Sequence, residues 1–421
     1  MRKHKYSNLI AQDCDTMHDV VERFLRYVKI DTQSQPDVED RFPSTEKQKD
    51  LGKLLVEELT GMGLSAELDE NGYVYSTLPS NTDKAVPVIG LIAHMDTSPD
   101  APGANVNPQI ITYQGGDIEL GNNVVIKAED NPELQKWLGK EIITTDGTTL
   151  LGADNKAGVA EILAAVKYLL DHPEVPHGVI KIGFTPDEEV GNGAKYFDIK
   201  KFGAKYAYTI DGGPMGEVEN ETFNAASATF RITGIGVHPG SAKGKMVNAI
   251  RIISELVGMI PQATAPETTE GKEGYLHVHH LKGEVDYAEA KLLIRDFTKE
   301  GMENKKYYLG KVRDMVAERW PKANIELEIK DSYSNMLEVL SKHQEVVDFA
   351  LAAAKLAGME PKLTSIRGGT DGARLCFEGL PTPNIFAGGL NYHGIREWIP
   401  VEAMEKAVET VVNLVKLWHG K

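Results

Sequence analysis

The chain has 421 residues, which is more than one ordinary hydrophobic core holds, and it therefore predicts two domains. A formal net charge of -16 argues against a nucleic-acid or anionic membrane surface as partner. No apolar stretch is long enough to span a bilayer, and the basic residues 1–14 lack the apolar core of a signal peptide. Two cysteines, Cys14 and Cys376, make no disulfide framework, so we expect a reducing, cytoplasmic setting.

The first half of the chain alternates helix-like and strand-like segments. Residues 17–30 and 45–63 carry apolar side chains at intervals of three and four, which is typical of amphipathic helices. Residues 85–96 are almost all apolar, as expected of a central strand covered on both faces. The alternation continues with strands at 72–79, 178–189 and 205–211 and a helix at 155–174. This order predicts a layered α/β sheet.

The pattern changes at about residue 223, where the predicted elements follow the order β-α-β-β-α-β. These segments are residues 223–234, 245–260, 274–283, 288–297, 305–320 and 323–333. The order is typical of a ferredoxin-like domain. Beyond residue 334 the alternation resumes with a helix at 343–358, a strand at 380–389 and a helix at 401–418. We therefore expect a layered α/β domain, residues 1–222 and 335–421, interrupted by an inserted ferredoxin-like α+β domain, residues 223–334.

His94 and Asp96 stand at the carboxyl end of a predicted central strand, in "AHMD". Residues two apart in a strand face the same side, so the acid lies beside the histidine. Zinc prefers imidazole and carboxylate ligands, and an acid commonly orients a ligating imidazole ring. A local hydrogen bond at a strand end is the alternative, and for this motif alone it is the better explanation.

Other acids and a histidine occupy similar positions. Asp154 follows a glycine turn before a helix, where a helix N-cap is the simpler explanation. Glu188 and Glu189 are adjacent after one strand, and Asp211 ends another, where an ordinary turn is the alternative. His393 lies in a glycine-rich loop before the last helix. Each alternative is reasonable for one site alone, but five such sites in this order are poorly explained as five independent coincidences.

The ordered motifs "HMDT", "GADNKAG", "PDEEVG", "DGG" and "NYHG" resemble those of the dizinc exopeptidase family that includes carboxypeptidase G and succinyl-diaminopimelate desuccinylase. The resemblance covers nearly the whole chain, and only about the first fifteen residues look like an extension. It implies two zinc ions per subunit. Asp154 would bridge both ions, with His94 and Asp211 completing the ligands of one ion and Glu189 and His393 those of the other.

The resemblance also implies the catalytic groups. Asp96 would hydrogen-bond His94, and Glu188 would be the general base that activates the attacking water. Many relatives have a second acid after the bridging aspartate, where this chain has Asn155. Because the expected ligand is Asp154, this departure puts little in doubt.

The inserted domain would act as a lid. His238 matches a family histidine that stabilises the tetrahedral oxyanion, within its own subunit or across a dimer. Asn248, Arg295 and Arg367 are candidates for binding the carboxylate or backbone of a peptide, for which the two-pronged guanidinium of arginine is well suited. A structural ion pair is an equally good explanation for these three residues.

Within the family, the resemblance favours an aminopeptidase that releases the N-terminal residue of tripeptides. The alternatives are a dipeptidase, a carboxypeptidase or an N-acyl amino acid deacylase with the same dizinc site, or a non-catalytic metal- or peptide-binding relative. Such a relative would be expected to lose the base or a ligand, and this chain keeps them all. We expect a small peptide as substrate, no nucleic-acid or membrane partner, and a homodimer as an option that the resemblance leaves open.

Overall fold

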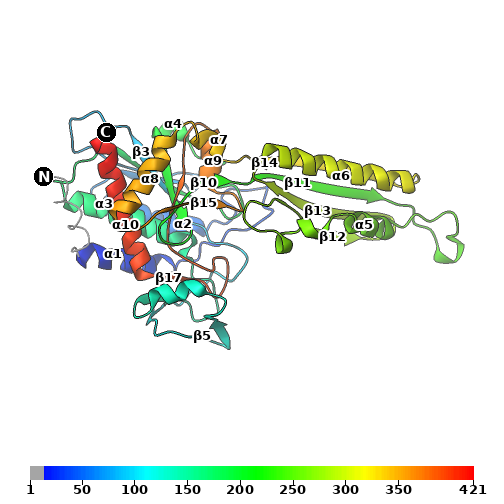
Figure 1. The fold of residues 1–421 in the computed structure, drawn as a ribbon, viewed down its shortest axis with the longest axis horizontal. Coiled ribbons are helices and arrows are strands. Elements are labelled where there is room, and N and C mark those ends of the chain that lie inside the picture. Colours follow the sequence, from blue (N-terminus) through cyan, green and yellow to red (C-terminus); the bar gives the residue numbers. More distant parts are fainter. Residues whose placement is uncertain (1–13) are drawn as a thin grey trace. The chain divides into compact units, whose positions relative to one another are not determined.

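The computed structural model describes residues 14–421, which form two compact units (Figure 1). The first unit contains the chain up to Asn220 together with Glu338–Thr364 and Thr370–Lys421. The second contains Glu221–Leu337 and the short segment Ser365–Gly369. A layered α/β fold with an inserted α+β domain, as expected from the sequence, is confirmed. The expectations for the basic N-terminal extension lie outside the described residues.

An eight-stranded mixed sheet forms the centre of the first unit. Its strands in spatial order are β1 (Ala66–Leu68), β2 (Val74–Leu78), β8 (Ile180–Thr185), β3 (Ile89–His94), β9 (Tyr206–Gly212), β16 (Asn384–Phe386), β10 (Glu217–Thr222) and β15 (Lys362–Ile366). The strands β8, β3, β9 and β16 run in parallel. All six residues of β3 are buried, which agrees with its apolar sequence.

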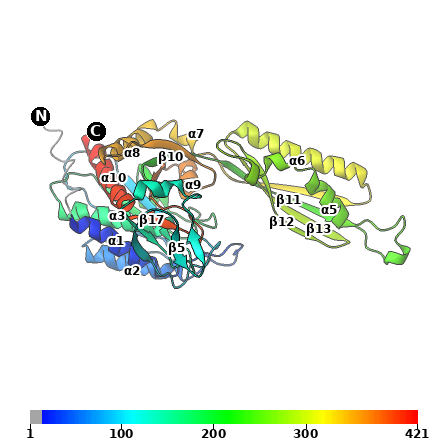
Figure 2. The ribbon, with the colours of Figure 1, turned by 60° about the horizontal axis from the view of Figure 1, so that its bottom comes forward.

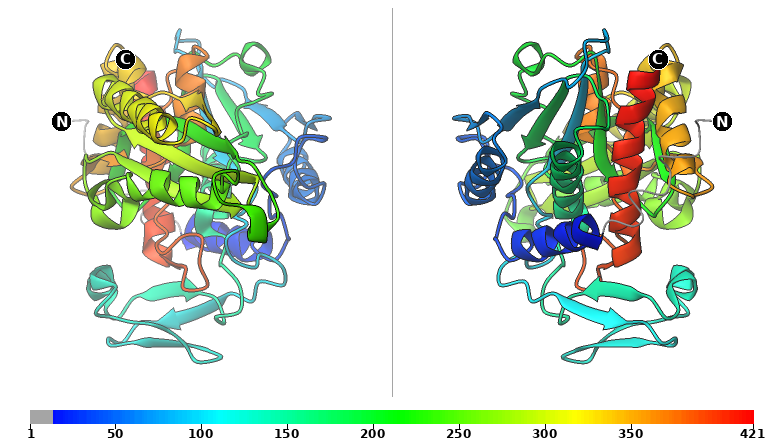
Figure 3. Two further views of the ribbon diagram at one scale, coloured as in Figure 1. Left: turned by 90° about the vertical axis from the view of Figure 1, so that its right-hand side faces the viewer. Right: turned by 90° about the vertical axis from the view of Figure 1, so that its left-hand side faces the viewer.

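Helices cover the sheet on both sides. They are α1 (Cys14–Tyr27), α2 (Gln48–Gly61), α3 (Ala153–Asp171), α4 (Ile199–Phe202), α7 (Leu337–Leu340), α8 (Gln344–Leu356), α9 (Asp371–Phe377) and α10 (Val401–Gly420). α1, α3 and α10 lie side by side (Figure 3). α2 and α8 pack on the same face of the sheet as these helices, where Gly52 of α2 lies beside Val74, while Phe202 of α4 and Leu375 of α9 pack on the opposite face. α3 is buried on almost all sides, which agrees with the small and apolar side chains that it carries around its whole circumference. No helix in the described part of the chain is long and apolar enough to cross a membrane.

A small β-layer in the first unit lies within residues 97–152 and 398–400. It consists of β17 (Trp398–Pro400), β7 (Glu141–Thr144) and β4 (Gln109–Thr112), with a hairpin of β5 (Ile118–Gly121) and β6 (Val124–Ile126). Trp137, which ends a short 3-10 helix (Pro132–Trp137), and Trp398 help to form its core. No helix or strand was expected from the sequence between residues 97 and 152.

The second unit is a four-stranded antiparallel sheet with two helices. Its strand order is β12 (Tyr275–Gly283), β13 (Tyr287–Asp296), β11 (Asn224–Thr233) and β14 (Asn324–Tyr333). α5 (Ala249–Gly258) and α6 (Lys299–Arg319) pack on one face of this sheet (Figure 2). Buried alanine, leucine and isoleucine side chains alternate along β13, which is the pattern of a sheet with one covered face. The predicted β-α-β-β-α-β order is confirmed.

Candidate metal centre

Parallel strands bring most of the predicted ligands to one edge of the main sheet. β3 pairs in parallel with β8 on one side and with β9 on the other. His94 ends β3, Glu188 and Glu189 follow β8, and Asp211 lies near the end of β9. Since the carboxyl ends of parallel strands meet at one edge, these side chains converge there. Asp154 reaches the same place from the first turn of α3.

His94 is 2% exposed, and both of its ring nitrogens have defined neighbours. Nδ1 lies 3.0 Å from the backbone carbonyl oxygen of Asp96 and is suited to donate to it. Nε2 lies 2.9 Å from Asp154 Oδ1 and 3.3 Å from Asp211 Oδ1. A proton on Nδ1 leaves the lone pair of Nε2 directed at the two carboxylates, which is the arrangement of a ligating imidazole.

Asp154 has one carboxylate oxygen directed toward each of two histidines. Oδ1 faces His94, while Oδ2 lies 3.3 Å from His393 Nε2. His393 Nε2 also lies 2.9 Å from Glu189 Oε2. The described residues therefore form two three-residue groups with metal-ligand spacing, and both contain Asp154: one with His94 and Asp211, the other with Glu189 and His393.

Asp96 is fully buried, and its carboxylate accepts hydrogen bonds from the backbone of both adjacent glutamates. The N–H of Glu188 donates to Oδ1 at 3.0 Å, and the N–H of Glu189 donates to Oδ2 at 3.2 Å. Asp96 Oδ1 also lies 3.3 Å from His94 Nδ1. One carboxylate therefore fixes the chain that carries both glutamates and contacts the His94 ring.

The electrostatics of the cluster favour positive charge. Burial raises the pKa of Glu189 to about 8 and also raises the pKa of Asp211. Despite burial, the pKa of His94 is raised by Asp211 and Asp154, and hydrogen bonds to Asp154 and Glu189 raise the pKa of His393 to about 11. Burial opposes ionisation of Asp154, but its hydrogen bonds to the two histidines lower its pKa.

The residues present fit a pair of divalent cations. All five groups offer nitrogen or oxygen atoms of the kind that zinc binds. Glu189 Oε1 is buried and has no hydrogen-bond partner among the described residues, so one ligand oxygen is left unsatisfied by the protein. Cations at the two groups would stabilise the carboxylates in their ionised form and leave the histidines neutral.

Burial also raises the pKa of Glu188 well above its ordinary range, although the charge of His94 opposes the shift. The acids Asp211, Asp371 and Glu189 add to it. A carboxyl with a raised pKa is suited to accept a proton and to return it in the same reaction.

Two acids that the sequence analysis missed support this centre. Asp100 Oδ2 lies 3.2 Å from His393 Nδ1, the ring nitrogen opposite the one that faces Asp154. Asp371, at the start of α9, accepts a hydrogen bond from Thr185 Oγ1 at 2.7 Å, and burial raises its pKa to about 7. "SPD" and "GGTDG" read as ordinary turns, so neither acid had a signal in the sequence.

The remaining predicted residues belong to the second unit, where each has structural partners. His238 Nδ1 accepts from the N–H of Gly240, and Asn248 Oδ1 caps α5 by accepting from two backbone N–H groups. Arg295 Nη1 donates to two backbone carbonyl oxygens, and its guanidinium lies 5.6 Å from the Tyr333 ring centre.

Arg367 is the most fully engaged of the predicted substrate-binding residues. Its Nη1 donates to the carbonyl oxygens of Gly271 and Glu273, and its Nη2 to the carbonyl and hydroxyl oxygens of Thr269. The guanidinium also lies within 5.8 Å of the Tyr275 ring centre. These partners are backbone carbonyl, hydroxyl and ring groups rather than the carboxylate of an ion pair.

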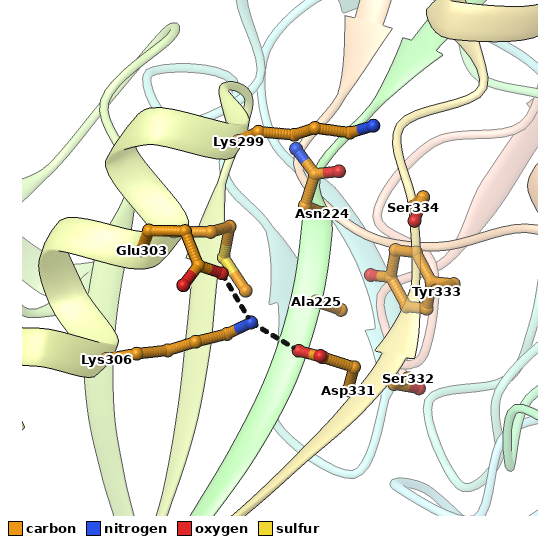
Figure 4. A pocket seen from close by; sticks show the side chains of 10 residues that line it. Asn224, Ala225, Lys299, Glu303, Lys306, Asp331, Ser332, Tyr333 and Ser334 are labelled. Carbon is orange, nitrogen blue, oxygen red and sulfur yellow. Dashed lines mark hydrogen bonds and ion pairs between the residues drawn. The ribbon is translucent and has the colours of Figure 1, made fainter.

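Two cavities differ in their relation to the metal centre. A cleft of about 730 Å³ in the first unit is lined by Asp100 and Glu189 and opens beside the second ligand group. A pocket of about 310 Å³ in the second unit lies between α6 and the end of β14 (Figure 4). Its Lys306 is paired with Glu303 and Asp331, and it contains none of the predicted site residues. Of these two cavities, the cleft is the one that metal-ligand candidates line.

A layered α/β fold with two ligand groups sharing one carboxylate is an arrangement of dinuclear metallohydrolases. A comparison with family models narrows this class, because the model described as peptidase family M20/M25/M40 matches residues 135–417. The chain belongs to this peptidase family. It is a hydrolase of peptide bonds with a metal cofactor, and the resemblance to the exopeptidases is confirmed.

Relatives and solved structures agree with this assignment. A protein from Clostridium acetobutylicum named peptidase T is 52% identical over 409 residues, covering 96% of this chain and 100% of the relative. A peptidase T from Caldanaerobacter subterraneus is 51% identical with the same coverage. The aminopeptidase PepT structure from Bacillus cereus matches with a TM-score of 0.74 and 25% identity, covering 96% of this chain and 99% of that one.

Proposed function

We propose that this protein is an aminopeptidase that releases the N-terminal residue of tripeptides with the help of two zinc ions. The observation that carries the proposal is the placement of Asp154, whose two carboxylate oxygens face two different histidines. The names of the relatives, peptidase T and aminopeptidase PepT, support the choice of substrate. They do not favour a dipeptidase, a carboxypeptidase or an N-acyl amino acid deacylase.

His94 and Asp211 would hold one ion, Glu189 and His393 the other, and Asp154 would contact both. Bound zinc would polarise the peptide carbonyl and lower the pKa of the attacking water. Contacts within the protein hold the ligand candidates in position: Asp96 restrains the His94 ring and the backbone of both glutamates.

Glu188 would act as the proton carrier of the reaction. Its carboxylate would take a proton from the attacking water and deliver it to the amine that leaves when the peptide bond breaks. Its place in the buried cluster supports this role, since the Glu188 carboxyl interacts electrostatically with the ligand candidates His94, Asp211 and Glu189. Asp96 supports it further by fixing the Glu188 main chain.

The second unit would contribute His238 to stabilise the oxyanion and Asn248, Arg295 and Arg367 to bind the peptide. Arg295 Nη2 and Asn248 Nδ2 have no partner among the described residues, which supports these two for binding a carboxylate or a backbone carbonyl. Arg367 has less support because both of its terminal nitrogens already donate.

We further propose a cytoplasmic location, with a homodimer as the assembly that the resemblance leaves open. The absence of a disulfide framework in the sequence supports the location, because only two cysteines occur and Cys376 is free and buried. Cell fractionation tests the first proposal, and analytical ultracentrifugation of the full chain tests the second. Recovery in a secreted fraction contradicts the location, and a monomer at micromolar concentration contradicts the assembly.

The substrate assignment is tested by comparing three peptides with the zinc-loaded full chain. They are a tripeptide with a free amine, its N-acetylated form and the matching dipeptide. We expect kcat/KM for the free tripeptide to exceed both others by at least about 10-fold, because a lost hydrogen bond to a charged group costs roughly 1.5–3 kcal/mol. Preferred cleavage of the acetylated form contradicts an aminopeptidase while leaving the metal centre intact.

A further inference from the structure

Glu397 is a buried acid that neither the motifs nor the predicted ligand groups include. It is 1% exposed and lies four residues after His393, just before β17. We propose that Glu397 is a positioning residue: its carboxylate holds the loop Leu151–Asp154 and thereby sets the orientation of the Asp154 carboxylate.

The carboxylate of Glu397 accepts three hydrogen bonds from one short stretch of main chain. Oε2 accepts from the N–H of Leu151 at 2.7 Å and from the N–H of Gly152 at 2.9 Å, and Oε1 accepts from the N–H of Asp154 at 3.1 Å. Burial raises the pKa of Glu397 to about 7, and the hydrogen bonds from the three N–H groups oppose this rise. Hydrogen bonds to the ionised carboxylate are roughly twice as strong as those between neutral groups. Three of them within four residues fix the path of the loop.

The local backbone explains why the loop needs an external acceptor. Gly152 has φ 81°, in the left-handed region, and Asp154 has φ -85° and ψ 103°, which is not helical although it lies in the first turn of α3. The N–H groups here are too early in the helix to find partners within it, and leaving them buried without acceptors is costly. Glu397 supplies the acceptors from a different part of the chain.

The same carboxylate connects two loops that carry metal-ligand candidates. Asp154 is the last residue of the loop that Glu397 holds. Its Oδ2 faces His393, which lies on a second loop that ends at Glu397. The base of that second loop is closed by reciprocal backbone hydrogen bonds between Leu390 and Trp398. Glu397 therefore fixes the His393 loop and the Asp154 loop relative to each other.

A buried carboxylate is expensive to maintain unless it is well paired, so its presence requires compensation. The three N–H groups provide it, and the buried side chain of Lys156 interacts electrostatically with Glu397. Lys156 is itself anchored, because its Nζ donates to the carbonyl oxygen of Ile30 at 2.6 Å. If Glu397 only filled space, an apolar side chain of similar size would stabilise the fold as well or better.

The test measures zinc binding to metal-free full-length protein by equilibrium dialysis. The side chain of Glu397→Gln has one oxygen and one NH₂ group where the carboxylate has two oxygens, so it loses acceptors facing the loop. We expect its zinc dissociation constant to rise about 10–100-fold, the usual effect of losing a group that orients a ligand. Glu161→Gln is the matched control, since Glu161 is a fully buried acid on α3 without a hydrogen-bond partner among the described residues.

Zinc affinity within twofold of the wild type in Glu397→Gln would overturn the proposal, provided that Glu161→Gln also binds normally. A second measurement is hydrogen exchange of the metal-free wild type, which does not depend on whether a variant folds. We expect slow exchange at the amides of Leu151, Gly152 and Asp154, and exchange at least 10-fold faster in Glu397→Gln or, if that chain does not fold, in Glu397→Asp. Fast exchange of these amides in the wild type would also overturn it.

The inference rests on the proposed metal centre, and the two can fail separately. Wild-type protein that binds no zinc contradicts the centre, while the exchange arm still reports on the Glu397 contacts. Normal zinc binding by the wild type and by Glu397→Gln contradicts only the role of Glu397.

Discussion

The carboxylate of Asp96 contacts the backbone of Glu188 and Glu189 at neighbouring N–H groups, and this separates the tasks of two adjacent acids. Both glutamates lie in a turn that follows β8. Glu189 Oε2 faces His393, while the carboxyl of Glu188 interacts electrostatically with His94 and Asp211. One residue can thus serve as a ligand and its neighbour as a base.

Glu188→Gln separates proton transfer from metal binding. Glutamine has nearly the same shape, but it has no basic oxygen for the proton of the attacking water. We expect the variant to fold and to bind zinc like the wild type while kcat falls about 10²–10⁴-fold, the usual contribution of a general base. Steady-state kinetics with metal analysis measure both effects, and the exposed Glu46→Gln is the control. Wild-type kcat in Glu188→Gln would remove Glu188 as the base.

Glu189→Ala removes one of the three protein ligands in the group that contains His393. We expect the zinc content to fall from about two to about one ion per chain after dialysis at limiting zinc, because two ligands hold an ion much less tightly than three. Metal analysis by mass spectrometry measures the ratio. Two tightly held ions in this variant would show that Glu189 is not a ligand.

At the scale of the elements, α3 contains an isolated buried carboxyl group. Glu161 has no hydrogen-bond partner for either carboxylate oxygen among the described residues, and burial raises its pKa well above the ordinary value. Above the ordinary pKa of a glutamate the unfolded chain releases this proton while the folded protein retains it. Stability therefore falls as the pH rises from the unfolded-state pKa toward the raised folded-state pKa.

Glu161→Gln should abolish this pH-dependent loss. We expect a small change in Tm at pH 4, where the acid is mostly protonated in both states, and a higher Tm at pH 8, by roughly 1 °C for each kcal/mol that is recovered in a chain of this length. Calorimetry of the metal-free protein at both pH values measures the difference. An equal shift at the two pH values would mean that the carboxyl is not held neutral in the folded protein.

Elements with strong periodicity could be predicted, and those without it could not. β3 and α10 follow directly from an apolar run and an amphipathic repeat. α6 begins at Lys299, six residues before the predicted start at 305, because Thr298 caps a first turn that is too polar to show a hydrophobic stripe. The short strands between Gln109 and Thr144 gain their order from packing around Trp137 and Trp398, which sequence periodicity does not report.

At the scale of the whole molecule, the predicted metal ligands could be recognised because each occupies a strand end or a loop in a fixed order. The residues that hold them were harder to find. Glu397, Asp371 and Asp100 act through contacts between segments separated by 186 to 293 positions, counted from Thr185 to Asp371 and from Asp100 to His393 in the extreme cases. No local pattern encodes such contacts, so only the three-dimensional structure shows them.

The central claim is that tripeptide cleavage depends on two metal ions held by one shared cluster. It is tested most directly by removing metal from the full-length protein with a chelator and adding zinc back in measured amounts while following hydrolysis of a free-amine tripeptide. We predict that activity falls to background without metal and returns fully as zinc reaches about two equivalents per chain. Undiminished cleavage by protein shown to contain less than about 0.1 equivalent of metal would contradict the account.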